Sequence, residues 1–283
     1  MIKLKKNLAD ITTFISPELY YRLSYFHNRG RWLHLKNPTN LSEFIISQIV
    51  SGKTNDYAIY ADKYRVRDFV TERGLAYILP KLYGNWIDAN DINFDALPNQ
   101  FVLKQNAGCG LNIICFDKAK LNIQETINKL NEWMQIKTFF RAEPHYDLIE
   151  KCIIAEELIQ DEYYDLPTDY KFMCINGILH HILVVIDRKE HTAPKKFAYS
   201  LEWEKLDLLT EKRHNEDLPR PKNLNKMTEY ARVLSQGFDF VRVDLYDTGD
   251  KVYFGEMTFT PQGGLLRNHT MKALEEMWNL NKL

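Results

Sequence analysis

The residues best suited to chemistry lie in two apolar segments close to the C-terminal end of the chain. Alternation along the first segment would place Arg242 and Asp244 on one face of a strand. Alternation along the second would do the same for Glu256 and Thr258, and the turn residues at 247–250 would join the two as a hairpin. Neighbouring carboxylates repel each other unless a cation lies between them, and hard oxygen ligands suit Mg²⁺. We therefore predict a metal site; two surface carboxylates on an ordinary hairpin are the alternative.

A lysine and two glycines form a second candidate site. Lys104 ends the apolar segment that starts at Phe101, and Gly108 and Gly110 follow in a loop. A lysine at the end of a buried strand is costly unless it meets an anion. Glycines let backbone N–H groups approach phosphate oxygens. Together these residues suggest a phosphate-binding loop, although a G-x-G hairpin taken alone is more often a plain turn.

Acidic residues mark two further strand ends. Glu156 and Glu157 close an apolar segment and could hold a ribose hydroxyl or an amino group. Asp169 and Lys171 share one face at the start of the next strand. A solvated strand terminus and an exposed cross-strand ion pair are the respective alternatives.

The hydrophobic pattern predicts an α+β protein. Antiparallel hairpins alternate with helices, which argues against a parallel Rossmann-type sheet. The expected helices follow Ser16 and lie at 41–52, 62–73, 121–136 and 224–236. The expected strands lie at 101–104, 112–116, 153–159, 170–175, 178–186, 240–246 and 251–257. Residues 75–82 suggest a short extended piece, and 188–222 a polar stretch.

In their order along the chain these motifs resemble the ATP-grasp superfamily. The resemblance implies two α+β lobes, with mainly antiparallel sheets, that clasp ATP after a helical N-terminal region. It divides the chain into a helical segment, an N-terminal α/β element, a small lobe with the phosphate loop and a large lobe with the metal site, at 1–56, 57–98, 99–155 and 156–283.

The same resemblance implies roles in nucleotide binding. Lys63 and Lys104 would contact the ATP phosphates, and Gly108 and Gly110 would lie in the mobile loop above them. The remaining nucleotide contacts would come from the hinge that holds adenine and ribose and from the following strand, that is from Glu156, Glu157, Leu158, Asp169 and Lys171.

The resemblance also implies metal, catalytic and substrate residues. Asp244 and Glu256 would hold Mg²⁺ with Thr258, which stands where the superfamily usually has Asn. Arg242 would stabilise the reacting acyl centre. Lys171 and His191 would be further catalytic residues, His191 as acceptor of the amine's proton; a solvent-exposed loop histidine is the alternative. Substrate contacts would come from Asp187, Arg188, Thr260, Gln262 and Gly263.

A narrower set of motifs is similar to the TupA-like ATP-grasp family, which is tied to teichuronopeptide and capsular polysaccharide synthesis. The motifs are Ala61-Asp62-Lys63-Tyr64, Leu103-Lys104-Gln105-Asn106, Asn112-Ile113-Ile114-Cys115, Asp169-Tyr170-Lys171-Phe172, Asp187-Arg188, His191-Thr192 and Gly255-Glu256-Met257-Thr258-Phe259-Thr260-Pro261. This similarity spans about residues 38–268. It implies an ADP-forming ligase that uses ATP and Mg²⁺ to join amino acids or amines to uronic acids or peptides of surface polymers.

Other function classes remain open at this point. A kinase of the same fold would stop after phosphoryl transfer to a hydroxyl, and a non-catalytic module of a polysaccharide assembly complex would not need the metal residues. A glycosyltransferase is disfavoured, because no D-x-D motif stands at a strand end.

Composition narrows the partners and the compartment. The formal net charge of −1 argues against a nucleic-acid-wrapping protein. All four cysteines lie in or beside apolar runs, which predicts buried free thiols and fits a reducing cytoplasm. Residues 1–36 hold seven Lys or Arg against Asp10 and Glu18. This basic, aromatic segment predicts either contact with the inner membrane face or a lipid-linked glycan, or packing on the protein itself.

Overall fold

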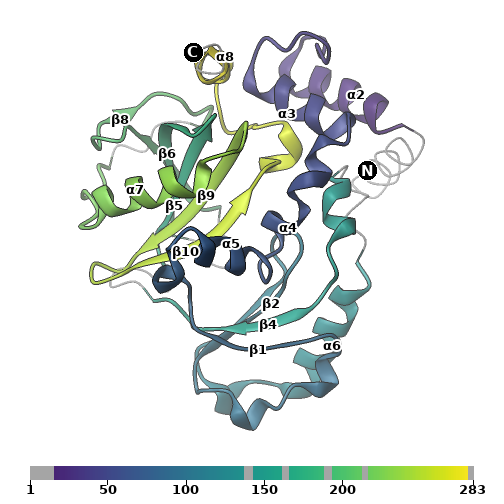
Figure 1. Ribbon diagram of the computed structural model, residues 1–283, viewed down its shortest axis with the longest axis vertical. Helices are drawn as coiled ribbons and strands as arrows, with labels where there is room; N and C mark the ends of the chain where they lie inside the picture. The colour runs from purple at the N-terminus through teal and green to yellow at the C-terminus, as the bar shows by residue number, and fades with distance from the viewer. Residues whose placement is uncertain (1–15, 137–142, 161–165, 188–192, 212–215, 280–283) are drawn as a thin grey trace.

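The computed structural model describes residues 16–136, 143–160, 166–187, 193–211 and 216–279, and it contains two separate antiparallel sheets (Figure 1). The small sheet has the order β1-β4-β2-β3, with strands Leu82–Trp86, Ile153–Glu156, Phe101–Gln105 and Asn112–Cys115. The large sheet has the order β10-β9-β5-β6-β7-β8, with strands Val252–Thr258, Phe240–Asp247, Asp169–Ile175, Ile178–Ile186, Lys195–Tyr199 and Lys205–Leu206. The predicted α+β class is confirmed.

Helix α6 (Ile123–Met134) packs on the small sheet. Its N-terminus is capped by Asn122, whose side chain accepts a hydrogen bond from Glu125 N at 3.1 Å. Leu130 and Trp133 on its inner face pack with buried sheet residues such as Leu103. This core fixes β2, and with it Lys104, the next residue along that strand.

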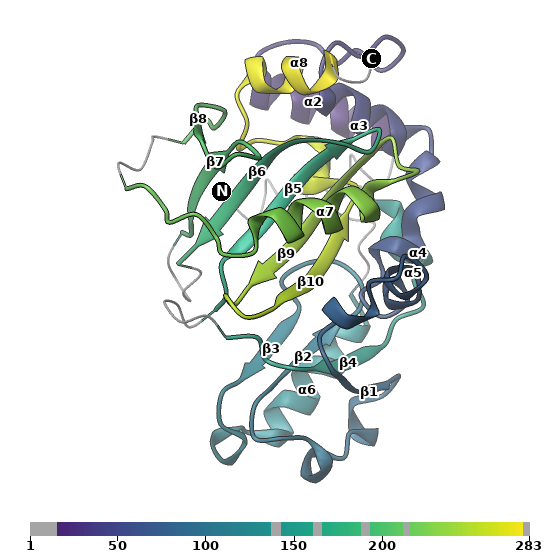
Figure 2. The same ribbon diagram turned by 60° about the vertical axis from the view of Figure 1, so that its left-hand side comes forward.

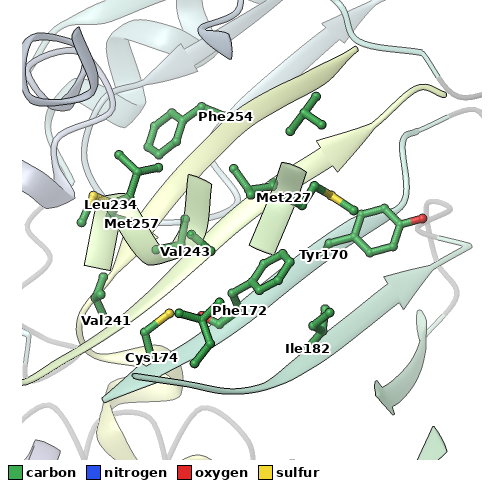
Figure 3. Close-up of a cluster of buried hydrophobic side chains, with 14 of the residues drawn as sticks. Tyr170, Phe172, Cys174, Ile182, Met227, Leu234, Val241, Val243, Phe254 and Met257 are labelled. Atoms are coloured by element: carbon green, nitrogen blue, oxygen red, sulfur yellow. The ribbon is translucent and has the colours of Figure 1, made fainter. Parts of the chain in front are cut away.

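Helix α7 (Leu224–Ser235) covers one face of the large sheet (Figure 2). Met227 and Leu234 of the helix pack onto Phe172 and Val243 of the sheet (Figure 3). Because side chains alternate along a strand, the neighbours Lys171 and Asp244 point to the opposite face. The residues that pack under α7 thus determine which side chains of the sheet, Lys171 and Asp244 among them, lie on the opposite face.

Three helices pack at the end of the molecule far from the small sheet (Figure 1). They are α2 (Pro17–Arg29), α3 (Leu41–Val50) and α8 (Met271–Asn279). Helix α2 begins as predicted, with Ser16 Oγ accepting a hydrogen bond from Leu19 N at 3.2 Å. It buries Tyr21 and Tyr25 against the other helices. Packing on the protein itself, one of the two alternatives for the basic segment, is thus observed for this face of α2, and residues 1–15 lie outside the described residues.

The expected helix at 62–73 is shorter than predicted. The chain forms α4 (Ala58–Ala61) and α5 (Val66–Glu72), whose C-cap is Arg73, and the following Gly74 has a φ of 77°. The reason is Asp62, whose Oδ1 accepts hydrogen bonds from Tyr64 N and Arg65 N and so builds a turn before the helix.

Several further elements lie outside the predicted ones. The extended piece expected at 75–82 contains η2 (Ala76–Ile78), and strands β1, β7 and β8 and helix α8 were not expected. The remaining short helices are η1 (Lys53–Tyr57), η3 (Ala89–Asp91), η4 (Phe94–Ala96), η5 (Lys118–Lys120), η7 (Pro144–Leu148) and η8 (Pro261–Gly264). None of the helices described is long and apolar enough to cross a membrane.

One cysteine departs from the prediction of buried thiols. Cys115, Cys152 and Cys174 are buried, but Cys109 is exposed. Cys109 lies between Gly108 and Gly110 in the loop after β2, where no apolar layer covers it. The prediction was therefore wrong for this residue.

Candidate functional site

The hairpin of β9 and β10 brings the predicted metal residues together. Glu256 pairs with Asp244 across the ladder, and Thr258 pairs with Arg242. The register shifts between Phe254 and Glu256, so that the residue between them is an extra one. This bulge turns Glu256 toward the face that carries Asp244, although Phe254 two positions earlier faces the core.

Arg242 holds this group in place. Its Nε donates to Asp244 Oδ1 at 2.7 Å, and its Nη2 donates to Asp244 Oδ2 at 2.7 Å. The same Nη2 reaches Glu256 Oε1 at 3.1 Å and Thr258 Oγ1 at 3.0 Å. A planar guanidinium is suited to such a bidentate contact. The four residues predicted from two strand faces are thus joined by one side chain.

Lys171 extends the group to the adjacent strand β5. Its ammonium contacts Asp169 Oδ2 at 2.5 Å and donates to Asp244 Oδ2. The side chains of Lys171 and Asp169 are only 14% and 6% exposed. The alternative of an exposed cross-strand ion pair is therefore wrong, because both residues belong to the buried cluster.

The charges in this cluster respond to burial and to one another. Burial would raise the pKa of Glu256, but Lys63, Arg242 and Lys171 outweigh it and lower the pKa to about 2. Burial raises the pKa of the Asp244 carboxyl, against the opposing effect of Arg242 and Lys171. For Arg242 the effect of burial is outweighed by Asp244 and Glu256, which raise its pKa above the ordinary value.

Lys63 links the hairpin to the glycine loop. Its Nζ lies 3.6 Å from Glu256 Oε2 and donates to the carbonyl oxygen of Gly108. Asn106 fixes this arrangement, because its carbonyl accepts from Lys63 N at 3.0 Å and its side chain donates to Asp62 at 2.9 Å. Gly108 and Gly110 both have positive φ, near 75°. The predicted phosphate lysine, loop and metal hairpin therefore meet.

Lys104 and the acidic strand end form a second charged group on the small sheet. Lys104 Nζ contacts Glu156 Oε2 at 2.8 Å, and Arg67 Nη1 contacts Glu156 Oε1 at 2.8 Å. Glu157 links the large sheet to the start of β1, since Tyr253 of β10 donates to its Oε1 at 3.3 Å while its Oε2 accepts from Lys81 N at 3.1 Å. Leu158 follows with partial exposure.

The predicted substrate residues are placed only in part. Thr260 lies two residues beyond Thr258, is 1% exposed and donates to Glu143. Gln262 and Gly263 have positive φ within η8, and Gln262 Oε1 accepts from Asn268 N at 3.3 Å. Asp187 directly follows β6. Arg188 and His191 lie outside the described residues.

Three residues at the site were missed by the sequence analysis. Arg67 had a signal, because it stands four residues after Lys63 on a predicted helical stretch. Glu143 and Tyr146 had none, since they lie in a short segment without a regular pattern. Burial raises the pKa of Tyr146 well above its ordinary value, and the charges of Glu143 and Glu256 raise it further.

The residues present fit a magnesium nucleotide. Asp244 and Glu256 supply two hard carboxylates, and Mg²⁺ commonly takes its other ligands from phosphates and water. No group of three or more His, Cys, Asp or Glu that could hold a metal occurs among the described residues. The ammonium groups of Lys63 and Lys104 and the glycine loop offer anion contacts.

Comparisons with solved structures find proteins of similar architecture. D-alanine–D-alanine ligase from Bacillus anthracis is 13% identical, with a TM-score of 0.47 and coverage of 82% of this chain and 76% of that one. ATP-grasp ligase PsnB complexed with minimal precursor is 10% identical, with a TM-score of 0.43 and coverage of 84% and 68%. L-amino acid ligase from Bacillus licheniformis is 14% identical, with a TM-score of 0.44 and coverage of 75% and 45%. At these identities the likeness concerns the fold and not the substrate.

Most of the chain matches the model of one protein family. No curated protein matches the chain. The family model for TupA-like ATP-grasp proteins matches residues 43–277, which include the lysines, the loop and the metal hairpin. The chain belongs to the TupA-like ATP-grasp family.

Proposed function

We propose that this protein is an ATP-dependent carboxylate–amine ligase that forms ADP and phosphate. The observation that carries the proposal is the buried cluster in which Arg242 holds Asp244 and Glu256 beside Lys63 and the glycine loop. Such a cluster combines a metal site, a phosphate site and a fixed positive charge. A binding module would not need all three in contact.

The phosphates of ATP would be held by two lysines, each of which contacts a carboxylate in the structure. Lys63 contacts Glu256 and a loop carbonyl, and Lys104 contacts Glu156. Because ammonium groups bind phosphate strongly, both lysines would turn toward the nucleotide, and the glycine loop would supply backbone N–H groups. Glu157, at the hinge between the sheets, would contact the adenosine end.

The chemical steps would take place beside Arg242. An oxygen of the substrate carboxylate attacks the γ-phosphorus, the bond to ADP breaks, and an acyl phosphate forms. The amine nitrogen then attacks the acyl carbon, the amide bond forms, and phosphate leaves. Arg242 would stabilise the negative oxygen in both steps as a preorganised charge. Mg²⁺ on Asp244, Glu256 and Thr258 would neutralise the β- and γ-phosphates.

Lys171 and Asp169 would act through Asp244. Lys171 contacts both carboxylates, so it keeps Asp244 turned toward the reaction face. Substrate contacts would come from Asp187, Thr260, Gln262 and Gly263, and from Arg188 and His191 outside the described residues. The acid would be a uronic acid or peptide of a surface polysaccharide and the amine an amino acid, as the family resemblance suggests.

We further propose that the protein acts in the cytoplasm, at the inner face of an anionic membrane. Helix α2 exposes a stripe of Leu19, Leu23 and Phe26, and Phe26 packs on the exposed Trp32 with ring centroids 4.7 Å apart. Residues 1–36 hold seven Lys or Arg against two acids, and this excess suits a negative surface, although Arg29 donates to backbone carbonyls of the protein itself.

Vesicle sedimentation tests the membrane contact. Phe26→Ser with Trp32→Ser should abolish sedimentation with phosphatidylglycerol vesicles, whereas Ile87→Ser, which removes a more exposed apolar side chain directly after β1, should not. Unchanged sedimentation of the double variant would exclude this role for α2.

The ligase activity is tested by turnover of ATP with Mg²⁺ against uronic acids and amino acids. ADP and phosphate should form only when both an acid and an amine are present. ADP without free phosphate would indicate a kinase instead, and AMP would contradict the acyl-phosphate route.

A further inference from the structure

The chain that follows the metal hairpin has a left-handed backbone at several residues. Gln262, Gly263 and Gly264 have φ values of 56°, 64° and 79°. Leu266 follows with a φ of 45°. Glycine adopts this region at little cost, but a glutamine or a leucine there is strained unless the surrounding structure holds it. Residues 261–266, the left-handed loop, must therefore be held by contacts with other segments.

An arginine of helix α2 binds the carbonyl groups at the end of the left-handed loop. Arg29 Nη2 donates to the carbonyl oxygens of Leu265 and Leu266, both at 2.8 Å. Its Nη1 donates to the carbonyl oxygen of His269 at 3.0 Å. The planar guanidinium presents its N–H groups in a fixed fork, so one side chain binds three carbonyl groups in one geometry. Arg29 thus stabilises the strained backbone at Leu266 directly.

Helix α3 holds the middle of the same loop. Ser42 Oγ donates to the carbonyl oxygen of Gly264 at 2.6 Å. A Cβ at Gly264 would lie 3.0 Å from Ile46 Cγ1 and 3.2 Å from Ile45 Cγ2, so the loop backbone lies directly against this helix (Figure 1). Two N-terminal helices therefore fix the loop, α2 by a guanidinium group and α3 by a hydroxyl group and close packing.

The left-handed loop lies on the face of the large sheet that carries the metal cluster. Met173 is two residues from Lys171 on strand β5 and pairs with Arg242 in the ladder, so it shares a face with both. Met173 also belongs to one buried cluster with Leu265 and Leu266 of the loop. The loop and the metal cluster are therefore neighbours on the reaction face.

Resting on the proposed ligase function, we propose that Arg29 is a positioning residue for the carboxylate substrate. It holds the left-handed loop in the conformation in which Gln262 and Gly263 contact the acid beside Arg242. The proposed nucleotide contacts come from other segments, namely the two lysines and the glycine loop. Loss of Arg29 should therefore weaken binding of the acid and leave nucleotide binding unchanged.

Hydrogen exchange followed by mass spectrometry tests the clamp without any need for turnover. In Arg29→Met the backbone amides of residues 262–270 should exchange at least about 10-fold faster than in the wild type, because the segment loses three hydrogen bonds to a charged group. Peptides from β9 and β10 should exchange as in the wild type, since the sheet stays folded. Unchanged exchange at 262–270 would overturn the assignment.

Steady-state kinetics tests the role of the loop in binding the acid. Hydroxylamine replaces the amine: its nitrogen attacks the acyl carbon of the acyl phosphate, a hydroxamate forms and phosphate leaves. With D-glucuronate or D-galacturonate varied at saturating MgATP, Arg29→Met should raise the KM for the acid at least about 10-fold and change kcat less than about 2-fold, as expected when only substrate binding is lost.

Calorimetric titration with MgADP separates this role from a general defect of the site. The Kd of Arg29→Met for MgADP should stay within about 2-fold of the wild-type value. A KM for the acid equal to that of the wild type, or a loss of MgADP affinity as large as the rise in KM, would overturn the proposal.

Arg22→Met is the matched control, because Arg22 lies on the same helix and donates to Glu18 and to the carbonyl oxygen of Leu33. It should resemble the wild type in exchange at 262–270 and in the KM for the acid. Arg29→Lys keeps the charge but not the planar fork, so it should resemble Arg29→Met. Wild-type behaviour of Arg29→Lys would overturn the clamp. No hydroxamate from the wild type would refute the ligase function and with it the acid site, whereas the exchange rates would still decide the clamp.

Discussion

Glu256 and Asp244 are paired across the hairpin but differ in how they respond to pH. The three neighbouring cations lower the pKa of Glu256 to about 2 although burial opposes them. A carboxyl with a lowered folded pKa contributes stability above its unfolded pKa of about 4.3, and this contribution is lost as the pH falls toward the folded value. Glu256 would thus remain an anionic ligand for the proposed Mg²⁺ at every pH at which an amine substrate is reactive.

Neutralising Glu256 should remove the metal site while keeping the fold. Glu256→Gln preserves the size of the side chain but takes away one of two anionic ligands, so Mg²⁺-dependent ATP turnover should fall by at least about 100-fold (~3 kcal/mol). Steady-state ADP release and thermal unfolding measure the two effects. Full activity in this variant would contradict the metal assignment.

Asp244→Asn should abolish the same turnover and also destabilise the protein. Arg242 and Lys171 both form a buried ion pair with the Asp244 carboxylate. Its loss should lower the free energy of unfolding by about 3–5 kcal/mol. Chemical denaturation measures the free energy of unfolding of Asp244→Asn and of Glu256→Gln. Equal stability of the two variants would show that the cations find other partners.

Lys104 should contribute to nucleotide affinity from the small sheet. Lys104→Ala removes a partly desolvated charge partner of the phosphates and should weaken ATP binding by about 2–5 kcal/mol. Lys120→Ala, with a side chain 84% exposed on the same lobe, is the control. An ATP affinity that Lys104→Ala leaves unchanged would exclude this lysine from the phosphate site.

At the scale of elements, the metal hairpin depends on one glycine. Gly255 occupies the bulge between Phe254 and Glu256, and a Cβ there would lie 2.9 Å from the carbonyl oxygen of Asp244. Only a glycine lets β10 approach β9 this closely while its side chains change face. The bulge, and not simple alternation, sends Phe254 to the core and Glu256 to the site.

Gly255→Ala should therefore impair catalysis without touching any charged side chain. The added Cβ must push Asp244 away from Glu256, so we expect at least a 10-fold loss of Mg²⁺-dependent turnover, measured by titrating Mg²⁺. Gly30→Ala strains a distant helix end with a φ of 67° and controls for a general loss of stability. Wild-type Mg²⁺ dependence in Gly255→Ala would show that the bulge tolerates a side chain.

The elements with a strong internal pattern could be predicted from the sequence, and the elements that depend on distant partners could not. Strands β2, β5, β6, β9 and β10 carry continuous or alternating apolar residues, and alternation along β9 placed Arg242 and Asp244 on one face correctly. The bulge that separates Phe254 from the face of Glu256 was not predicted. Strand β1 pairs with β4, some 70 residues later, and its own five residues show no clear alternation of burial.

The same distinction applies to the site. Lys63 and Lys104 stand next to recognisable signals, but the contact of Thr260 with Glu143 joins residues more than a hundred positions apart. Such proximity follows from the packing of whole segments and leaves no local pattern. Glu143 and Tyr146 were missed for this reason.

At the scale of the whole molecule, buried histidines should make stability depend on pH. Burial lowers the pKa of His145 to about 4 and that of His269 to about 3, and it lowers the pKa of His181 well below its ordinary value. In the unfolded chain each binds a proton near pH 6.5. Because the unfolded state then holds more protons, stability falls as the pH drops from about 6.5 toward 4.

From pH 7 to pH 5.5 the free energy of unfolding should decrease by roughly 3–4 kcal/mol, about 1.2 kcal/mol for each histidine. Urea denaturation at the two pH values measures the change. His145→Phe should remove about a third of it, since neither ring nitrogen of His145 has a partner among the described residues. A stability that is flat over this range would mean that these histidines accept protons in the folded protein.

Lys63 contacts Glu256 of the large sheet and the Gly108 carbonyl in the loop beyond β2 of the small sheet. The central claim is that the groups on the two sides cooperate to form an acyl phosphate. The most direct test is to supply a uronic acid labelled with ¹⁸O in its carboxylate, together with ATP, Mg²⁺ and an amino acid. Mass spectrometry should find one ¹⁸O atom in each inorganic phosphate released, because the acid oxygen attacks the γ-phosphorus and departs with it. Unlabelled phosphate formed during turnover would contradict the acyl-phosphate mechanism and the role given to Arg242.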